Sequence, residues 1–206
     1  MISLYLLAVI VASYILQLVI PGYTDAFIFN PSLVATEPWR MVTNIFLHGD
    51  ITHLFFNGYA LFLFGIILER KVTHKQYLTL FFGAGIVGNI LYYAGILGGI
   101  IPPSLALGAS GAVYGILGAV AVMFPNLRIW MMFIPMTMRT AAIFWAVISL
   151  MGTFDTTSNI GYAAHLGGLI FGWGYAKSLE KKQNEYAWSE VTYQEDPFAP
   201  PKEGFM

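Results

Sequence analysis

Three short stretches of the sequence carry side chains that could perform acyl-transfer chemistry. In "LALGASGAVYGILGAVAVMF", residues 105–124, Ser110 is a hydroxyl set between glycines in an apolar run. "AAHLGGLIFG" carries His165, and "HGDITHLFFN" carries His53 and Asn57. A serine beside an imidazole forms a nucleophile with its general base, and side-chain N–H groups can stabilise the oxyanion that results. These residue types therefore indicate hydrolysis through a covalent acyl intermediate.

Each of these side chains also has a purely structural interpretation. Serine is a common small packing residue in membrane helices, where it bonds to its own backbone. His165 could equally be a polar tether between two helices, and His53 and Asn57 could anchor a loop. The choice depends on whether the four side chains share one place in the fold.

The composition indicates where the chain folds. The 206 residues are 57% hydrophobic and only 10% charged, and the mean hydropathy is +0.67, so the chain has more apolar surface than one soluble core could hide. We expect an integral membrane protein whose surroundings are the lipid bilayer. A net charge of -1 argues against nucleic acid as a partner. The absence of cysteine excludes disulfides and thiolate metal sites, and we expect no metal and no cofactor.

The apolar runs predict the fold class. A hydrocarbon core of roughly 30 Å needs about 20 mostly apolar helical residues to cross it. Six runs approach this length: residues 3–20, 51–68, 77–97, 105–124, 140–154 and 160–179. We expect an all-α membrane protein, a six-transmembrane-helix bundle over residues 1–179. A long outward-facing interfacial loop, about residues 21–50, joins its first two helices, and residues 180–206 form a loosely ordered polar cytoplasmic tail.

The basic residues predict the orientation. If the six runs alternate in direction, Arg40 lies on one side and nine other basic residues share the opposite side: Arg70, Lys71, Lys75, Arg128, Arg139, Lys177, Lys181, Lys182 and Lys202. Basic residues favour the cytoplasmic side of short loops. We therefore expect a multi-pass protein of a prokaryotic cell (inner) membrane with both termini in the cytoplasm.

The candidate side chains fall at one depth in this arrangement. The second, fourth and sixth runs point the same way, and each carries its polar residues in its first turns. From Phe124 at the inner interface back to Ser110, a helix rises roughly 21 Å, which leaves the hydroxyl about 9 Å below the outer surface. This shared depth favours one common site for Ser110, His165, His53 and Asn57.

The glycine pattern predicts how closely these helices approach. His165, Gly168 and Gly172 lie on one stripe of the sixth run, and Gly111 and Gly115 follow Ser110 on the fourth. Two faces of small residues can pack backbone to backbone, which would bring a serine within reach of an imidazole. One turn after Ser110, Tyr114 could hold the imidazole by stacking, although a core tyrosine would look the same. Packing by Tyr114 and Gly168 would orient His165.

The motifs together resemble those of the rhomboid family of intramembrane serine proteases. They are "LGASGAVYG", "HGDITHLFFN", "AAHLGGLIFG" and "EPWRM", in an order that covers residues 3–179. The resemblance implies that Ser110 is the nucleophile and His165 its general base. It further implies that His53 and Asn57 lie on the oxyanion side and that Tyr114 supports the base. Trp39, Arg40 and Glu69 would be structural.

The expected function is that of an intramembrane serine endopeptidase using a Ser-His dyad. Its substrates would be single-span or multi-span membrane proteins, cut in or near their transmembrane segments. The alternative is a rhomboid-like protein that binds membrane clients without cutting them, which the presence of both Ser110 and His165 disfavours. A small transporter is also disfavoured, because the polar residues lie in the outer third of the membrane and no internal repeat is evident.

Overall fold

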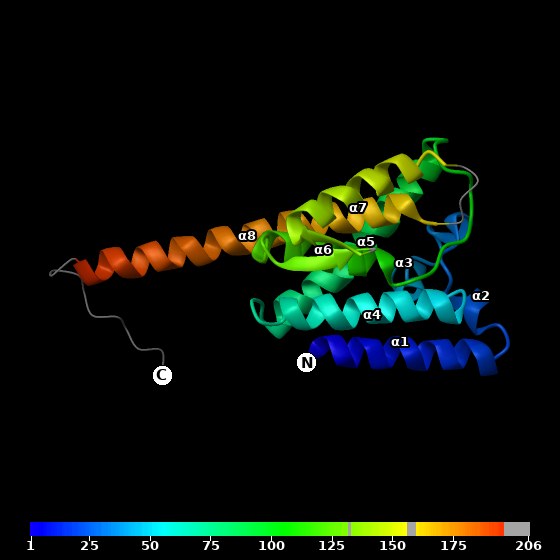
Figure 1. The fold of residues 1–206 in the computed structure, drawn as a ribbon. Coiled ribbons are helices and arrows are strands. Elements are labelled where there is room, and N and C mark those ends of the chain that lie inside the picture. The colour runs from blue at the N-terminus through cyan, green and yellow to red at the C-terminus, as the bar shows by residue number, and fades with distance from the viewer. Residues whose placement is uncertain (132, 156–159, 196–206) are drawn as a thin grey trace.

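The computed structural model describes residues 1–131, 133–155 and 160–195. Its long helices lie side by side in a bundle (Figure 1). They are α1 (Ile2–Val19), α4 (Ile51–Leu68), α5 (His74–Leu97), α6 (Ser110–Met123), α7 (Met138–Gly152) and α8 (Tyr162–Glu195). Four short helical segments lie between α1 and α4: α2 (Tyr23–Phe27), η1 (Pro31–Leu33), α3 (Arg40–Thr43) and η2 (Asn44–Phe46). A hairpin of β1 (Arg128–Met131) and β2 (Ile134–Thr137) connects α6 to α7.

Three of the described helices can cross a membrane by length and composition, namely α1, α4 and α5. The helices α6 and α7 are apolar but have only 14 and 15 residues. Expecting a helix from residue 105 was wrong, because α6 begins at Ser110. The preceding residues are extended, and Ala106 pairs with Phe29 in an isolated β-bridge. The six-span count stays a prediction.

The last helix is longer than expected. A loosely ordered tail was predicted from residue 180, but α8 continues to Glu195, so that prediction is wrong for residues 180–195. The segment is polar, yet it is rich in good helix formers and contains no Gly or Pro before Pro197. In Figure 1 this part of α8 extends well beyond the other helices. Residues 196–206 lie outside the described part of the chain.

The first connection is packed by hydrogen bonds to a buried arginine. Arg40 is 7% exposed, and its Nε forms an ion pair with Glu37 at 2.6 Å. Its Nη1 donates to the carbonyl oxygens of Asp25 and Ile28 at 2.6 and 2.9 Å. A buried guanidinium needs such partners, so these bonds fold residues 25–40 around one side chain.

The centre of the bundle is a contact between α6 and α8 that only glycine permits. A Cβ on Gly168 would overlap the carbonyl oxygen of Gly111, and one on Gly172 would overlap that of Gly115. A Cβ on Gly118 would lie 2.5 Å from the carbonyl oxygen of Leu169. The predicted backbone-to-backbone approach of these two helices is therefore confirmed. The contact lies next to Ser110 on α6 and His165 on α8.

The start of α1 is held by Glu69 at the end of α4. The Glu69 carboxylate accepts the backbone N–H groups of Ile2 and Ser3 at 3.1 and 2.8 Å, and also the Ser3 hydroxyl. The first N–H groups of a helix have no partner within the helix, and a negative charge at this end is favourable. Burial alone would raise the pKa of Glu69, but the bonds from Ser3 and Ile2 bring it below its ordinary value of 4.5.

Replacing Gly172 by Ala is expected to destabilise the protein by about 1–3 kcal/mol, because the added methyl forces α6 and α8 apart. Gly174 is the matched control, because a Cβ there meets nothing within 4 Å. Gly174→Ala should keep or slightly raise stability through the better helix propensity of alanine. Thermal unfolding of both variants in the same detergent compares them. Equal melting temperatures would contradict a tight α6–α8 contact.

Replacing Glu69 by Gln is expected to cost about 1.5–3 kcal/mol at neutral pH, the usual value for hydrogen bonds to a charged group. Because the pKa of folded Glu69 is lowered, its contribution is complete above the unfolded pKa and is lost as pH falls through the folded pKa. The gap in melting temperature between parent and variant should therefore close in acid. Glu180→Gln, which removes an exposed pair with Lys177, is the control. A gap independent of pH would rule out this role for the Glu69 charge.

Candidate active site

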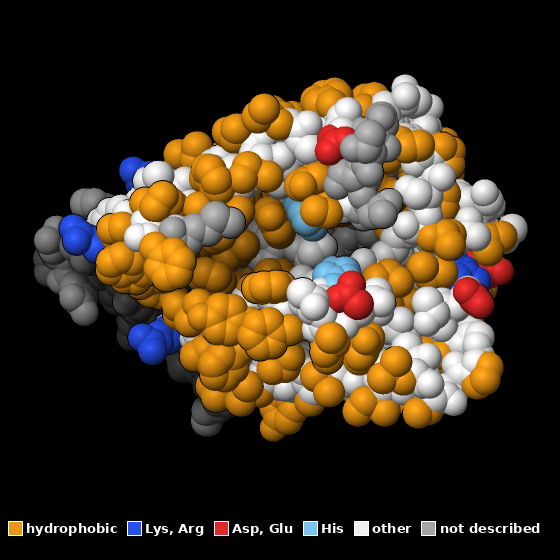
Figure 2. All heavy atoms as spheres, turned by 45° about the vertical axis from the view of Figure 1, so that its right-hand side comes forward, with side chains coloured by type: hydrophobic (Ala, Val, Ile, Leu, Met, Phe, Trp, Pro, Cys, Tyr) orange, Lys and Arg blue, Asp and Glu red, His pale blue; other side chains and the backbone are white. Residues whose placement is uncertain are grey.

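Five of the six predicted site residues line one cavity of about 840 Å³, and the sixth, Gly168, lies in the contact between α6 and α8. The cavity lies among α4, α5, α6 and α8, and Figure 2 shows a hollow on this face with histidine side chains at its edge. The lining includes His53, Asn57, Ser110, Tyr114 and His165. The structure therefore brings these side chains together from three separate parts of the sequence around one space.

Ser110 is the first residue of α6 and is half-buried. The turn before it depends on Gly108, which has φ +126° and whose N–H donates to the carbonyl oxygen of Asn44 at 2.9 Å. A Cβ at this position would lie 2.7 Å from Cε1 of His53. Only glycine combines this backbone angle with the close approach of the imidazole. Gly108 was not predicted to have a role in the site.

His165 lies in the first turn of α8 and is 8% exposed. Its ring stacks on that of Tyr114, with centroids 4.2 Å apart and an interplanar angle of 11°. Tyr162 meets the same ring edge-on at 6.0 Å. Among the described residues no group hydrogen-bonds to the buried Nδ1 of His165. Aromatic packing therefore holds this imidazole, and the contact with Tyr114 is the one expected.

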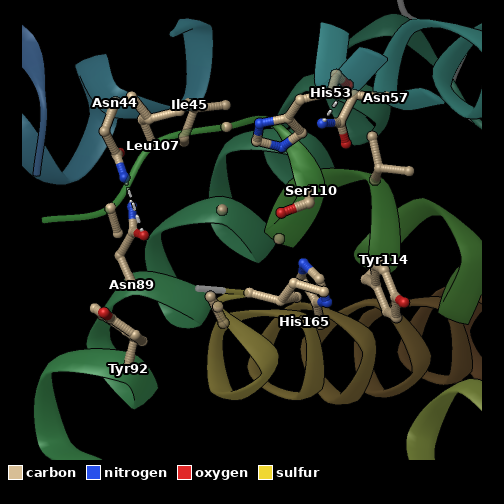
Figure 3. A pocket seen from close by; sticks show the side chains of 18 of the residues that line it. Asn44, Ile45, His53, Asn57, Asn89, Tyr92, Leu107, Ser110, Tyr114 and His165 are labelled. Carbon is tan, nitrogen blue, oxygen red and sulfur yellow. Dashed lines mark hydrogen bonds between the residues drawn. The ribbon is translucent and has the colours of Figure 1, made fainter. Parts of the chain in front are cut away.

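Ser110 and His165 face the same space. Figure 3 shows the Ser110 hydroxyl directed into the cavity with the His165 imidazole on the opposite side of that space. Gly168 lies one turn after His165, against the carbonyl oxygen of Gly111, so the α6–α8 contact lies beside both side chains. No hydrogen bond joins the hydroxyl to the imidazole in the part of the chain that the structure describes. Such bonds are often long in enzymes without substrate and tighten when it binds.

His53 and Asn57 line the cavity wall across Ser110 from His165 (Figure 3). Asp50 caps α4 by accepting the backbone N–H of His53 at 2.8 Å. Asn57 is 7% exposed, and its Nδ2 donates to the His53 carbonyl oxygen at 3.1 Å. An amide nitrogen carries two donors, so one N–H of Asn57 is left for a ligand in the cavity.

His48 packs behind His53 and was given no role by the sequence. Its ring is 1% exposed and meets the His53 ring edge-on, with centroids 5.0 Å apart. Its backbone N–H and carbonyl both pair with the side-chain amide of Gln17, at 2.9 and 3.1 Å. Burial, and next the neighbouring His53, lower the pKa of His48 to about 4. His48 therefore stays neutral at pH 7 and packs against His53 without adding charge.

A pair of asparagines in the cavity wall was also missed. Asn44 and Asn89 exchange side-chain hydrogen bonds at 3.2 and 2.9 Å, and Asn89 also donates to the carbonyl oxygen of Met41 at 2.7 Å. Both are buried, and Figure 3 shows their amides facing each other. Because the Asn44 carbonyl accepts from Gly108, this pair connects α5 to the turn before Ser110. An asparagine within the apolar run 77–97 was the available signal.

The cavity offers hydroxyl, imidazole and amide groups, and no set of metal ligands is apparent. Within residues 1–131, 133–155 and 160–195, no group of three or more His, Asp or Glu side chains is placed to hold a metal ion. The polar groups that line the cavity suit a peptide carbonyl and a water molecule as ligands.

Comparison with known proteins identifies the family. Residues 35–182, more than half of the chain, match the family described as Rhomboid domain. The rhomboid protease GluP of Bacillus subtilis (strain 168) is 38% identical over 151 residues, 73% of this chain and 28% of GluP. YdcA of the same bacterium is 34% identical over 163 residues, 77% of this chain and 76% of YdcA. Rhomboid protein 1, mitochondrial, of Saccharomyces cerevisiae is 30% identical over 157 residues, 72% of this chain and 45% of that protein.

The match therefore spans less than half the length of two of these three relatives. The motifs that carried the resemblance all lie within the matched residues 35–182. With its apolar helices, the chain is a membrane protein, and it belongs to the rhomboid family.

Proposed function

We propose that the protein is an intramembrane serine endopeptidase that hydrolyses peptide bonds in or near the transmembrane segments of membrane proteins. The observation that carries this proposal is the cavity, where Ser110, His165 and the donors His53 and Asn57 surround one space. Membership of a family with relatives named as proteases supports it.

In the proposed reaction, neutral His165 accepts the proton of Ser110 while the serine oxygen bonds to the peptide carbonyl carbon. The C–N bond of the tetrahedral intermediate then breaks, and His165 gives its proton to the leaving amine. Water hydrolyses the acyl-enzyme with the same imidazole as base. Stacking on Tyr114 supports the orientation of the base, since no described residue bonds to its Nδ1. Gly168 supports it by admitting the close α6–α8 contact.

Negative charge on the carbonyl oxygen would be stabilised from the opposite wall. Asn57 and His53 are the side-chain donors, and the backbone N–H of Ser110 is one of those that have no partner at the start of α6. In hydrolases each such donor contributes about 2.7–4 kcal/mol to the transition state. The wall that carries His53 is kept in place by His48 behind it and by Asp50 at the start of α4.

The proposed membrane arrangement keeps six spans within residues 1–179, with both termini in the cytoplasm of a prokaryotic cell (inner) membrane and residues 180–206 as a cytoplasmic extension. This orientation is supported by exposed basic residues near the α4–α5 turn and the connection from α6 to α7, since such residues favour the cytoplasmic side. They are Arg70, Lys71, Lys75, Arg128 and Arg139. Substrates in this arrangement are membrane helices whose outer end unwinds easily, because a peptide bond in an intact helix has its carbonyl already paired.

Ser110→Ala is expected to abolish cleavage, by roughly 10⁶-fold if the serine is the nucleophile. The change removes one oxygen from a half-buried position and should leave the melting temperature unchanged. Purified protein in lipid vesicles is tested on a panel of single-span membrane proteins, with cleavage read from gels and product masses. A fluorophosphonate should label the parent at Ser110 and fail to label the variant.

His165→Ala should lose cleavage and fluorophosphonate labelling together, because the serine is no longer activated. Cleavage by the Ser110→Ala protein would exclude Ser110 as nucleophile. A folded parent that is neither labelled nor active on the whole panel would favour the alternative, a rhomboid-like protein that binds membrane clients without cutting them.

Asn57→Ala is expected to lower kcat by roughly 10²–10³-fold with little change in KM, because an oxyanion donor acts on the transition state. Asn126→Ala, at an exposed asparagine outside the cavity, is the matched control and should keep full activity. Steady-state kinetics on one cleaved substrate measure both constants. An unchanged kcat for Asn57→Ala would leave the oxyanion to His53 and the backbone N–H.

A further inference from the structure

The β1–β2 hairpin presents an apolar outer surface away from the bundle. Its antiparallel register pairs Ile129 with Met136 and Trp130 with Pro135. Paired residues share a face of the hairpin. Ile129 packs against the core of the bundle, so the face of Trp130 and Pro135 points outward, and both residues are exposed.

The exposed side chains are large and lie at or next to the turn of the hairpin. Trp130 is 76% exposed, Phe133 is 95% exposed and Ile134 is 59% exposed. Phe133 also has φ +68°, a backbone conformation that bulky residues rarely adopt. Folding therefore accepts a strained backbone at a position where the phenyl ring has almost no contact with the rest of the chain. An exposed aromatic cluster of this kind favours contact with an apolar or interfacial medium.

The surroundings of the hairpin are basic. The sequence contains no Asp or Glu between Glu69 and Asp155. Arg128 begins β1 and Arg139 follows β2, and both are exposed, as are Arg70, Lys71 and Lys75 near the turn between α4 and α5. The two regions are adjacent, because Lys71 Nζ lies 5.9 Å from the ring centroid of Phe124 at the end of α6. The Lys and Arg side chains visible in Figure 2 lie mainly at one end of the molecule.

The apolar surface continues from the hairpin onto α7. Arg139 lies in the first turn of this helix, and the exposed residues that follow include Ile143, Phe144 and Val147. In a membrane protein, such helix faces contact lipid tails. The hairpin thus lies between an exposed apolar helix face and a group of exposed basic residues, an arrangement that suits the headgroup region of a bilayer.

We propose that the hairpin inserts into the membrane interface at the basic end of the bundle. Trp130, Phe133 and Ile134 lie at the boundary between headgroups and acyl chains, and Arg128 and Arg139 bind the phosphates of anionic lipids. Tryptophan favours this boundary, and basic residues beside it are attracted to anionic headgroups. The occupant is lipid, because Arg128 and Arg139 form no ion pair with a described acidic residue and so complement a phosphate-rich surface. The inference does not depend on the proposed protease activity.

The chain has no cysteine, so single labels can test this position. Trp130→Cys and Phe133→Cys are each labelled with an environment-sensitive fluorophore and reconstituted in vesicles of equal parts phosphatidylcholine and phosphatidylglycerol. Val147→Cys on the lipid-facing side of α7 and Lys75→Cys at an exposed turn are the matched controls. Nitroxide-labelled lipids and iodide present on both sides of the bilayer serve as quenchers. Circular dichroism confirms that each labelled protein is folded.

Labels at positions 130 and 133 should behave like the label at 147, with strong quenching by nitroxide lipids and several-fold weaker quenching by iodide than at position 75. Iodide quenching at 130 and 133 equal to that at 75 would overturn the proposal and leave the hairpin in water, as a surface for a protein partner.

The binding of anionic headgroups by Arg128 and Arg139 is tested separately. Replacing phosphatidylglycerol by phosphatidylcholine should weaken nitroxide quenching at position 133, and Arg128→Gln with Arg139→Gln should remove this dependence on lipid charge. Lys177→Gln, at a lysine already paired with Glu180, is the control and should keep it. Quenching that is the same in both lipids for the parent would exclude anionic headgroups as the ligand of these arginines.

Discussion

The contact between the backbones of α6 and α8 is the constraint on which the site depends. Side chains of ordinary size keep packed helices about 8–10 Å apart, and small residues allow a closer approach. Gly168 and Gly172 remove that separation, because each lies directly against a carbonyl oxygen of α6. Ser110 and His165 both lie at the cavity end of this contact. Its closeness therefore determines whether the two can act together.

Polar groups inside the bundle are paired with one another, and these pairs fix the walls of the cavity. The Asn44–Asn89 pair joins the first connection to α5, and the Gln17 amide joins α1 to the backbone of His48. In an apolar environment an unpaired amide costs several kcal/mol, so each such pair has a strongly preferred geometry. The side chains that face Ser110 are consequently held in part by hydrogen bonds between residues outside the cavity, such as those of Gln17 with the backbone of His48.

Much of this arrangement could be predicted from the sequence, and the rest depended on contacts between distant residues. The apolar runs predicted the long helices, and the stripe of Gly168 and Gly172 predicted the α6–α8 approach. The start of α6 at Ser110 was not predictable from hydropathy, because residues 105–109 are as apolar as the helix that follows them. These residues are extended instead, and Ala106 forms a β-bridge with Phe29. Asn89 and Gly108 were missed because their partners lie 45 or more residues away in sequence. The polarity of residues 180–195 was mistaken for disorder, although their helix propensity is high.

The short length of α7 has a consequence for the surrounding bilayer. Its 15 residues rise about 22 Å, which is less than the roughly 30 Å of a typical hydrocarbon core. This helix also has a broad apolar face open to lipid, including Ile143, Val147 and Met151. Hydrophobic mismatch of this size is relieved by local thinning of the bilayer, at a cost of a fraction of a kcal/mol per Å. If α7 is one of the predicted spans, the bilayer beside it has to be thinner than beside α5, or its flanking residues have to reach out to the interface.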